Sequence, residues 1–509
     1  MRADQTQSVP GVRNSFYDAV PYRGTIIPLT SPAHLCLCSR WHSGVTPRSD
    51  RYRLVELGCG DGANLLALAF YHPESVFLGI DSSENELGLA RENARGLGLA
   101  NLHFVRADVR DADPAAFAPC DFLIAHGLYS WVSYDVREAI LRFCRESLTP
   151  SGLAYISYNA QPGWAIRRLV RETLLRSRSV RDAPIEEKAA RAIEVATQLL
   201  EDLPSRNRAS AVLLAKELEW VRYGQPFYVF HEYLAEVNEG FWLGDFVERA
   251  RSNGLEYVAD AQFCRWEGRV APGLRAALAK RDMDRIEQEE AADLLGDRFF
   301  RTSILCRMDA ERSAAPREDL LGQVHIATSL AATSDRFHLR DGAVERFTGV
   351  GGAEIALDAA ITKAAVVLLS AQWPRGMDLR ELYSQSSALI SAHGYETTQS
   401  NPEARLRADL VTLFEVGQID LRLHESQPDI SVPEFPAAHS LARFEAGQRD
   451  ALSTRYHRPL PFEPAALAMI CELNGARSQA ELRRDFGAEL VDDTLTVLAR
   501  WGLLRKVGR

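Results

Sequence analysis

The sequence has little cysteine and no long apolar run. Only 8 of its 509 residues are cysteine, and none lies in a Cys-x-x-Cys pair. This argues against a disulfide scaffold and predicts reduced thiols in a cytoplasm. No stretch approaches the roughly 18 apolar residues of a membrane helix. The first five residues hold one Arg with no apolar core behind it, so we expect neither a secretory signal nor a membrane anchor.

Positive charge and metal-ligand patterns are scarce as well. Lys and Arg total 59 against 69 Asp and Glu, a net charge of −10. Such a chain lacks the bulk charge that favours nucleic-acid binding. Cys36 and Cys38 lie between His34 and His42, but Cys-x-Cys is not zinc spacing and no second ligand pair follows. We therefore expect a helix that packs two small thiols there, and no metal.

Alternating strand and helix patterns fill the first part of the chain. The composition, 46% apolar and 25% charged, is that of a globular protein, and the length predicts three or four domains. Five apolar runs recur with helical patterns between them, at residues 53–57, 76–80, 102–107, 122–125 and 153–157. Such alternation predicts an α/β fold with a doubly wound parallel sheet.

A glycine-rich loop follows the first of these runs. The sequence there is Glu56-Leu57-Gly58-Cys59-Gly60-Asp61-Gly62-Ala63-Asn64. Glycines let a backbone turn sharply and approach a ligand closely, and the next helix directs free N–H groups at an anionic group. The spacing of Gly58, Gly60 and Ala63 also satisfies the dinucleotide-binding fingerprint. The loop alone therefore does not identify its cofactor.

Two acids at later strand ends narrow the choice. Asp81 ends the second run 21 residues after Gly60, where a carboxylate can hold both hydroxyls of a ribose. Asp108 ends the third run, where an acid can accept from the exocyclic amine of an adenine. A nicotinamide enzyme needs the first acid but has no general need for the second.

Residues 55–64, Asp81 and 106–108 together resemble the S-adenosylmethionine site of class I methyltransferases. The resemblance implies a Rossmann-like seven-stranded sheet whose glycine loop approaches the methionine part of the cofactor. It assigns to cofactor binding Glu56, Gly58, Gly60, Gly62, Asn64, Asp81, Ser82, Asp108, Val109 and His126.

Helices interrupt the sheet pattern after residue 165. Apolar spacing predicts helices across residues 166–223, read as an insertion that caps the cofactor cleft. The arginines between 167 and 181 are interspersed with acids, which favours a solvated helix face over a basic binding surface. A helix is predicted at 241–253, and strands at 255–258 and 302–307 are predicted to complete the sheet.

Four further segments resemble bacterial methyltransferases that carry a methyltransferase regulatory domain. The segments are 125–132, 157–164, 231–234 and 298–305, and residues 14–22 resemble the lead-in of that group. The group includes protein lysine methyltransferases of rickettsial outer-membrane proteins. Ala160-Gln161 stands where Thr-Tyr is expected, which puts an aromatic wall of the acceptor pocket in doubt. Membership of this broad group does not establish lysine as the acceptor.

Aromatic and polar residues near the cleft are the candidates for contact with the acceptor. A lysine amine must lose its proton before it can attack, and aromatic surroundings with a polar oxygen favour that loss. The catalytic candidates are Tyr129, Trp131, Tyr158, Asn159, Trp164, His231 and Glu232, with Tyr17 and Tyr22 as residues that close over the acceptor. Each also has a plain structural interpretation, as core or as a helix cap.

Two absences disfavour base methylation. No Asn/Asp-Pro-Pro-Tyr signature, typical of methylases that act on adenine or glutamine amides, follows the fourth run. Cys120 stands at a strand start, whereas a cytosine-methylase nucleophile lies in a loop.

The last third of the chain holds two triplets of predicted helices. The first, at 362–373, 378–392 and 402–414, precedes a strand at 419–423, and the second lies at 464–473, 479–486 and 488–501. Both triplets suggest winged-helix-like modules, which raises DNA binding as a rival function. Residues 451–509 carry nine Lys plus Arg and seven Asp plus Glu, a net of only +2. Protein docking or dimerisation is therefore favoured over nucleic-acid binding.

The predicted organisation has six parts: a lead-in over the active site (1–50), a methyltransferase core (51–165), a helical cap (166–223), the end of the sheet with a regulatory region (224–310), and two modules (320–425 and 437–509). The leading hypothesis is methyl transfer from S-adenosylmethionine to a protein lysine in the cytoplasm. A small-molecule N- or O-methyltransferase is the alternative, and a cofactor-sensing DNA-binding regulator is a third.

Overall fold

The computed structural model describes residues 24–42, 44–203, 209–262, 282–312, 317–334, 337–349, 352–424 and 431–505. These residues form two compact units. The first takes its residues from 24–25, 47–261 and 282–311, and the second from 26–46, 262 and 312–505. The sequence analysis predicted that residues 1–50 form a lead-in over the active site. In the structure, residues 26–46 belong to the second unit. Tyr17 and Tyr22 lie outside the described residues.

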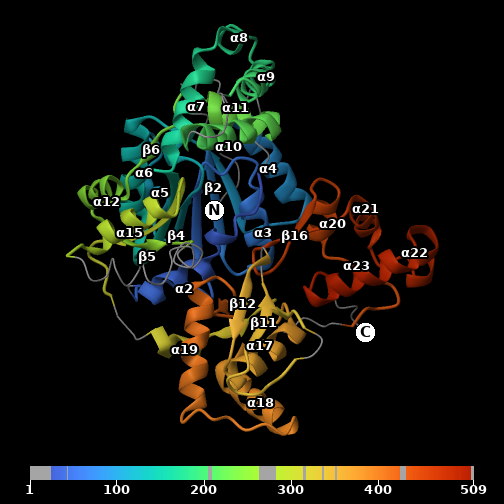
Figure 1. Cartoon of the computed structure of the whole chain (residues 1–509). Coiled ribbons are helices and arrows are strands. Elements are labelled where there is room, and N and C mark those ends of the chain that lie inside the picture. Colours follow the sequence, from blue (N-terminus) through green and yellow to red (C-terminus); the bar gives the residue numbers. More distant parts are fainter. Residues whose placement is uncertain are drawn as a thin grey trace. The chain divides into compact units, whose positions relative to one another are not determined.

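A mainly parallel sheet forms the centre of the first unit (Figure 1). Its order is β3-β2-β1-β4-β5-β8-β7, and β8 runs antiparallel to both of its neighbours. The strands are β1 (Arg53–Leu57), β2 (Val76–Asp81), β3 (Leu102–Arg106), β4 (Cys120–Ala125), β5 (Leu148–Ala160), β7 (Leu255–Asp260) and β8 (Phe300–Arg307). The α/β prediction and its seven strands are confirmed. An eighth strand, the two-residue β6 (Gly240–Phe241), pairs with the end of β5.

Helices cover the sheet, and local capping fixes where they begin. They are α3 (Ala63–Tyr71), α4 (Glu84–Gly96), α5 (Pro114–Phe117), α6 (Tyr134–Ser147), α12 (Leu243–Ser252) and α15 (Arg285–Leu295). The Ser83 hydroxyl accepts from the Glu86 N–H at the start of α4, as its position in the sequence predicts. The helix predicted at 241–253 begins at Leu243 instead, because Phe241 belongs to β6 and pairs with Ala160 of β5.

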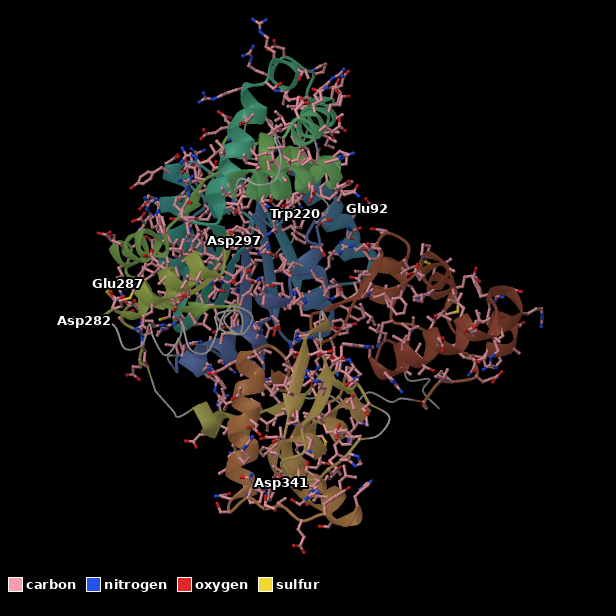
Figure 2. All side chains as sticks on the ribbon, viewed as in Figure 1. Glu92, Trp220, Asp282, Glu287, Asp297 and Asp341 are labelled. Carbon is pink, nitrogen blue, oxygen red and sulfur yellow. The ribbon has the colours of Figure 1, made fainter. Side chains whose placement is uncertain are left out.

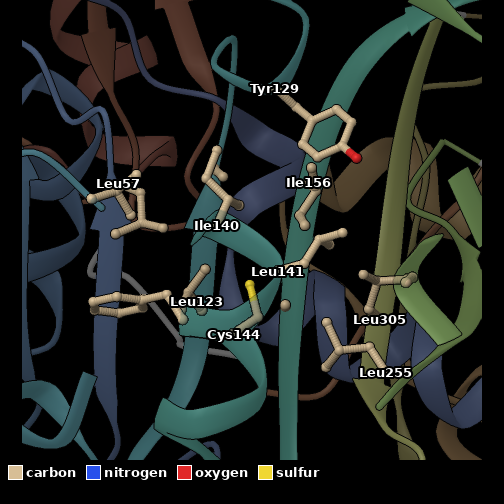
Figure 3. Close-up of a cluster of buried hydrophobic side chains, with 14 of the residues drawn as sticks. Leu57, Leu123, Tyr129, Ile140, Leu141, Cys144, Ile156, Leu255 and Leu305 are labelled. Carbon is tan, nitrogen blue, oxygen red and sulfur yellow. The ribbon is translucent and has the colours of Figure 1, made fainter. Parts of the chain in front are cut away.

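The core of the first unit lies between the sheet and α6 and α12. Figure 3 shows aliphatic side chains from β1, β4, β5, β7 and β8 in this cluster, with Ile140, Leu141 and Cys144 from α6. Tyr129, in the short helix η2 (Tyr129–Trp131), lies at its border and is 1% exposed. Burial of these groups is the main source of stability for the strand ends described below.

Five helices form the cap, with a hydrophobic cluster of their own. They are α7 (Trp164–Arg176), α8 (Arg178–Arg181), α9 (Lys188–Glu201), α10 (Ala209–Tyr223) and α11 (Pro226–Leu234). The prediction of a solvated arginine face is wrong for Arg167 and Arg171, which are 5% and 8% exposed. Both lie on the same side of α7 as Trp164, Val170 and Leu174, which are buried too.

The second unit contains the two predicted helix triplets. Its helices are η1 (Pro28–Thr30), α2 (Pro32–His42), α16 (Arg317–Leu320), η3 (Leu321–Gln323), α17 (Ala360–Gln372), α18 (Leu379–Ala392), α19 (Pro402–Glu415), α20 (Ser440–Ala446), α21 (Pro464–Glu472), α22 (Gln479–Phe486) and α23 (Ala488–Arg500). Cys36 and Cys38 are buried in α2, which confirms the expected helix. No helix in the described part of the chain is long and apolar enough to cross a membrane.

Three small sheets accompany these helices. One has the order β13-β9-β14, with β9 (His325–Ala327), β13 (Met377–Asp378) and β14 (Asp420–Arg422). Another is β10-β11-β12, with β10 (Ala331–Ala332), β11 (Glu345–Thr348) and β12 (Glu354–Leu357). The last pairs β15 (Ala451–Ser453) with β16 (Pro459–Pro461). The helix predictions and the strand at β14 are confirmed; the winged-helix interpretation stays a prediction.

Candidate functional site

The glycine loop follows β1 directly and turns back on the sheet. Gly58, Gly60 and Gly62 have φ of 70°, 53° and 73°, a region that side chains with a Cβ rarely adopt. The Gly58 and Cys59 N–H groups both donate to the Ile80 carbonyl, at 2.8 and 3.2 Å. A Cβ on Gly62 would lie 2.7 Å from the Phe104 ring. Glycine is therefore required here by conformation and by close packing.

Asp81, at the end of β2, is hydrogen-bonded to this loop. Its two carboxylate oxygens accept from the Gly60 N–H and the Ser83 N–H, each at 2.9 Å. Ser82, between them, is half-buried. The structure thus brings the predicted ribose acid to the middle of the glycine loop, at the carboxyl edge of the sheet, where open α/β sheets bind ligands.

Glu56 is a buried carboxyl group beneath the loop. It is 4% exposed, and one oxygen accepts from the Asn64 side-chain amide at 3.1 Å. Its other oxygen, Oε2, has no hydrogen-bond partner. Burial raises the pKa of Glu56 to about 8, and the nearby Asp61 and Asp81 charges add to the rise. A buried oxygen without a partner is costly, and a bound cation or donor would satisfy it.

Asp108 follows β3 and is engaged by an arginine that the sequence analysis missed. Arg110 binds it through two contacts of 3.1 and 2.7 Å, and also binds Asp135 at 2.7 Å. The hydrogen bond from Arg110 lowers the pKa of Asp108 below its ordinary value. Val109, between them, is 9% exposed. The Asp108 side chain is thus ionised at neutral pH. The signal in the sequence that could have revealed this pair is the arginine two residues after the aspartate.

His126 lies at the end of β4 between two aromatic rings. Its ring stacks on Tyr155 with centroids 5.8 Å apart, and Nδ1 is 2.9 Å from the Tyr155 hydroxyl. Phe300 contacts the other side at 5.8 Å. Burial lowers the pKa of His126 to about 4, so the imidazole is neutral at pH 7.

The predicted acceptor residues divide into two groups. Tyr129 and Tyr158 lie at the ends of β4 and β5, buried against Phe246, which stacks on Tyr158 at 4.3 Å. The Tyr158 hydroxyl lies 3.0 Å from Ser303 Oγ. Trp131, at the end of η2, is half-buried. These three line or underlie the carboxyl edge of the sheet.

The other group belongs to the cap. Trp164 is fully buried at the start of α7, and His231 and Glu232 are 4% and 7% exposed on α11. Glu232 pairs with Arg167 at 3.0 Å. Glu232 is thus held in an ion pair within the cap, and the assignment of His231 and Glu232 to the acceptor site stays a prediction.

Asn159 connects the two groups. Its backbone N–H donates to Ser130 Oγ at 2.8 Å, and its side-chain amide donates to Asn238 Oδ1 at 2.6 Å. Ser130 and Asn238 are both buried and were not predicted. Ser130 lies between the noted Tyr129 and Trp131, whereas Asn238 lies outside the motif segments that the sequence analysis named.

A groove begins directly after β5. Its volume is about 460 Å³. Four of its residues come from α7, and it is lined by Gln161, Ala165, Arg168, Leu169, Glu172 and Trp242. Gln161 is one of the two positions at which the sequence departs from the resembling group. Within the described ranges, no group of three or more His, Cys, Asp or Glu could hold a metal ion.

Comparison with known proteins gives two family matches within the first unit. Residues 54–152 match the family described as "Methyltransferase domain". Residues 225–307 match the "Predicted methyltransferase regulatory domain". The first match spans the glycine loop, Asp81 and Asp108, and the second spans Asn238, β7, α15 and β8.

Relatives and solved structures extend the similarity. The uncharacterized proteins RP789 and RP028 of Rickettsia prowazekii (strain Madrid E) are 32% and 29% identical, over 58% and 48% of this chain. The chain spans about half of RP789 (53%) and nearly all of RP028 (96%). The structure of PKMT2 from Rickettsia typhi in complex with AdoHcy matches with a TM-score of 0.83 at 21% identity, over 95% of this chain and 100% of that one. This likeness shows a common fold.

Proposed function

The chain carries an S-adenosylmethionine-dependent methyltransferase domain, and we propose that it transfers the cofactor's methyl group to a lysine side chain of a protein. The observation that carries the lysine assignment is the fold shared with PKMT2 over 95% of this chain, the second unit included. The regulatory-domain match supports it. A catalytic domain alone would not favour a protein acceptor over a small one.

The residues at the strand ends fit this cofactor. Asp81 would hold the ribose hydroxyls and Asp108 the adenine amine, while the glycine loop leaves room for the methionine part. S-adenosylmethionine is a cation, and the buried Glu56 Oε2 without a partner lies under that loop. When bound, the cofactor supplies a methyl group on a sulfonium, ready for in-line displacement.

The acceptor side must provide a neutral amine and exclude water. Removing the proton of a lysine at pH 7 costs about 4.6 kcal/mol, from an ordinary pKa of about 10.4. The rings of Tyr129 and Tyr158 at the ends of β4 and β5 disfavour a charged ammonium nearby. In this proposal Asn159 orients the amine, since its position at the end of β5 is fixed by two hydrogen bonds.

The test uses purified protein, methyl-labelled S-adenosylmethionine and a host lysate fractionated into protein, nucleic acid and small molecules. We expect label in protein, recovered as methyl-lysine after acid hydrolysis, and none with Asp81→Ala. Label only in small molecules would support the alternative, a small-molecule N- or O-methyltransferase.

The second unit has a proposed role as well. Its weakly charged helical modules favour docking of the protein acceptor or dimerisation in the cytoplasm. Light scattering of the purified chain distinguishes these roles: a dimer that dissociates on deletion of residues 437–509 would support dimerisation, and a monomer would support docking.

A further inference from the structure

Arg167 is a buried cation shared by three helices of the cap. From α7 it binds Glu217 on α10 at 2.6 Å and Glu232 on α11 at 3.0 Å. Its side chain is 6% exposed, and those of the two acids are 12% and 9% exposed. The Tyr233 hydroxyl also donates to Glu217. Trp220, three residues further along α10, is 52% exposed (Figure 2).

Aromatic rings complete the surroundings of the guanidinium. The guanidinium carbon of Arg167, Cζ, lies 4.8 Å from the ring centroid of Phe299, 5.7 Å from that of Tyr233 and 5.8 Å from that of Trp164. A planar guanidinium suits such a site because it stacks on rings while its N–H groups bind two carboxylates. Buried ion pairs repay their desolvation poorly, so a site of this kind is weak evidence for a purely stabilising role.

A hydrogen-bond relay leads from this site to the end of β5. The Glu232 backbone carbonyl accepts from the Asn238 side chain at 2.8 Å. Asn238 in turn accepts from the Asn159 side chain at 2.6 Å. All three residues are at most 7% exposed, so water does not compete for these bonds.

We propose that Arg167 is a positioning residue for methyl transfer: it joins α7, α10 and α11 into one rigid cap and, through Glu232 and Asn238, fixes the Asn159 side chain at the carboxyl end of β5. The inference rests on the proposed function and deepens it, because it makes the orientation of the acceptor depend on an ion pair that does not contact the acceptor. Cofactor binding does not depend on the relay, since Glu56, Asp81 and Asp108 lie outside it.

The test is a double-mutant cycle with Arg167→Lys and Asn238→Ala. Lysine keeps the charge but cannot bind both acids in the same geometry. Each single variant should slow label transfer about 100-fold, as misplacement by about 1 Å does. The double variant should be no slower than the worse single one, because both act on the same relay. Affinity for S-adenosylhomocysteine, measured by calorimetry, should stay within about twofold of wild type in all variants, because the residues proposed to bind the cofactor lie outside the relay.

Arg191→Met is the matched control. Arg191 lies on α9 of the same cap and pairs with Glu187 and Glu194, but its side chain is 44% exposed. Its loss should leave label transfer unchanged, and Asn238→Ala should have the same effect in its presence as in wild type. Hydrogen exchange gives a readout without an acceptor: Arg167→Lys should speed exchange of the Asn159 side-chain amide, which donates to Asn238, about tenfold.

Two results would overturn the proposal. One is an effect of Arg167→Lys that adds to that of Asn238→Ala, as independent losses of stability do. The other is normal transfer in Asn238→Ala. If the wild type labels small molecules and not protein, the proposed function fails, but the cycle is then run on that fraction. The exchange of the Asn159 amide decides on the coupling in either case.

Discussion

The two units bury their charged groups against different partners. In the first, Asp260, Asp293, Arg298 and Arg301 are each at most 3% exposed. Arg301 binds Asp293 at 2.6 Å and Glu289 at 3.1 Å, so β8 and α15 are held together by opposite charges. In the second unit, the Lys363 ammonium on α17 donates to the backbone carbonyls of Arg340 and Ala343, at 2.7 and 2.6 Å.

This difference relates to the site. Arg301 stands opposite Tyr158 in the pairing of β5 with β8, so the charge network of the first unit adjoins the proposed acceptor end of the sheet. Lys363 instead binds two backbone carbonyls of a turn, those of Arg340 and Ala343, within its own unit. Glu445 accepts from the Ser453 N–H at 2.6 Å in the same unit. Paired charges thus join β8 and α15 beside the site, whereas Lys363 and Glu445 of the second unit are held by neutral groups.

The largest effect should come from breaking the charge network of the first unit. Arg301→Met leaves Asp293 and Glu289 buried without their cation, so we expect unfolding to become easier by about 3–5 kcal/mol. Lys363→Met leaves two neutral carbonyls unsatisfied, which costs about 1–3 kcal/mol. Urea unfolding of both variants measures the difference. Equal losses would remove the distinction between the units.

Asp81→Ala should have the next largest effect, on binding and not on folding. Loss of two hydrogen bonds to a charged group predicts affinity for S-adenosylhomocysteine lowered about 100-fold. Asp121→Ala is the matched control: Asp121 accepts from the Arg53 N–H at 3.0 Å, at the opposite end of β1. Calorimetry should show normal affinity for this control. Normal affinity in Asp81→Ala would contradict its assignment to the ribose.

Glu56 gives cofactor binding a pH dependence. Its pKa is raised to about 8, so the free protein holds a proton there at pH 7. A bound cation favours the carboxylate, so affinity for S-adenosylmethionine should rise from pH 6 to 8, by up to about tenfold per unit, and level off above. The same shift makes the unliganded protein less stable as pH rises from 5 to 8. Glu56→Gln should flatten the binding profile, as calorimetry at each pH can measure.

The sequence predicted the strands and glycine loop because their signals are local. Gly58, Gly60 and Gly62 predict positive φ, and Asp81 and Asp108 directly follow runs with the pattern of strands. The helix predicted at 479–486 has equally local signals: Ser478 and Glu481 have the spacing of a capping box, and Gly487 follows its last residue. Such features depend on residues within a few positions of one another, which a sequence displays directly.

The relay and the charge networks were not predictable, because their partners are far apart in the chain. Arg167 pairs with Glu217 and Glu232, which lie 50 and 65 positions away. In the sequence, nothing distinguishes it from an arginine on a solvated helix face. Asn238 gives no signal until β6 has brought Gly240 beside Asn159. Tyr129 and Tyr158 were singled out as aromatic residues, but only the packing shows that Phe246 covers them.

The smallest effect separates two serines that each precede a helix, of which only Ser478 has the capping-box spacing to a glutamate. Ser478 precedes α22 and forms a full capping box with Glu481, whereas Ser133 precedes α6 and makes no cap hydrogen bond to that helix. The Ser133 hydroxyl instead donates to the Asp135 side chain at the surface. Ser478→Ala should therefore cost about 1 kcal/mol of stability, as the loss of a cap does.

Ser133→Ala should cost at most about 0.5 kcal/mol, as at an ordinary surface site. Thermal unfolding of both variants measures the two costs. Equal costs would mean that the hydrogen bonds of the box add nothing to the intrinsic preference for serine at a helix start. Unequal costs would place the stabilisation in the hydrogen bonds that Ser478 and Glu481 exchange, and so tie even this smallest contribution to a pairing that the sequence predicts and the structure displays.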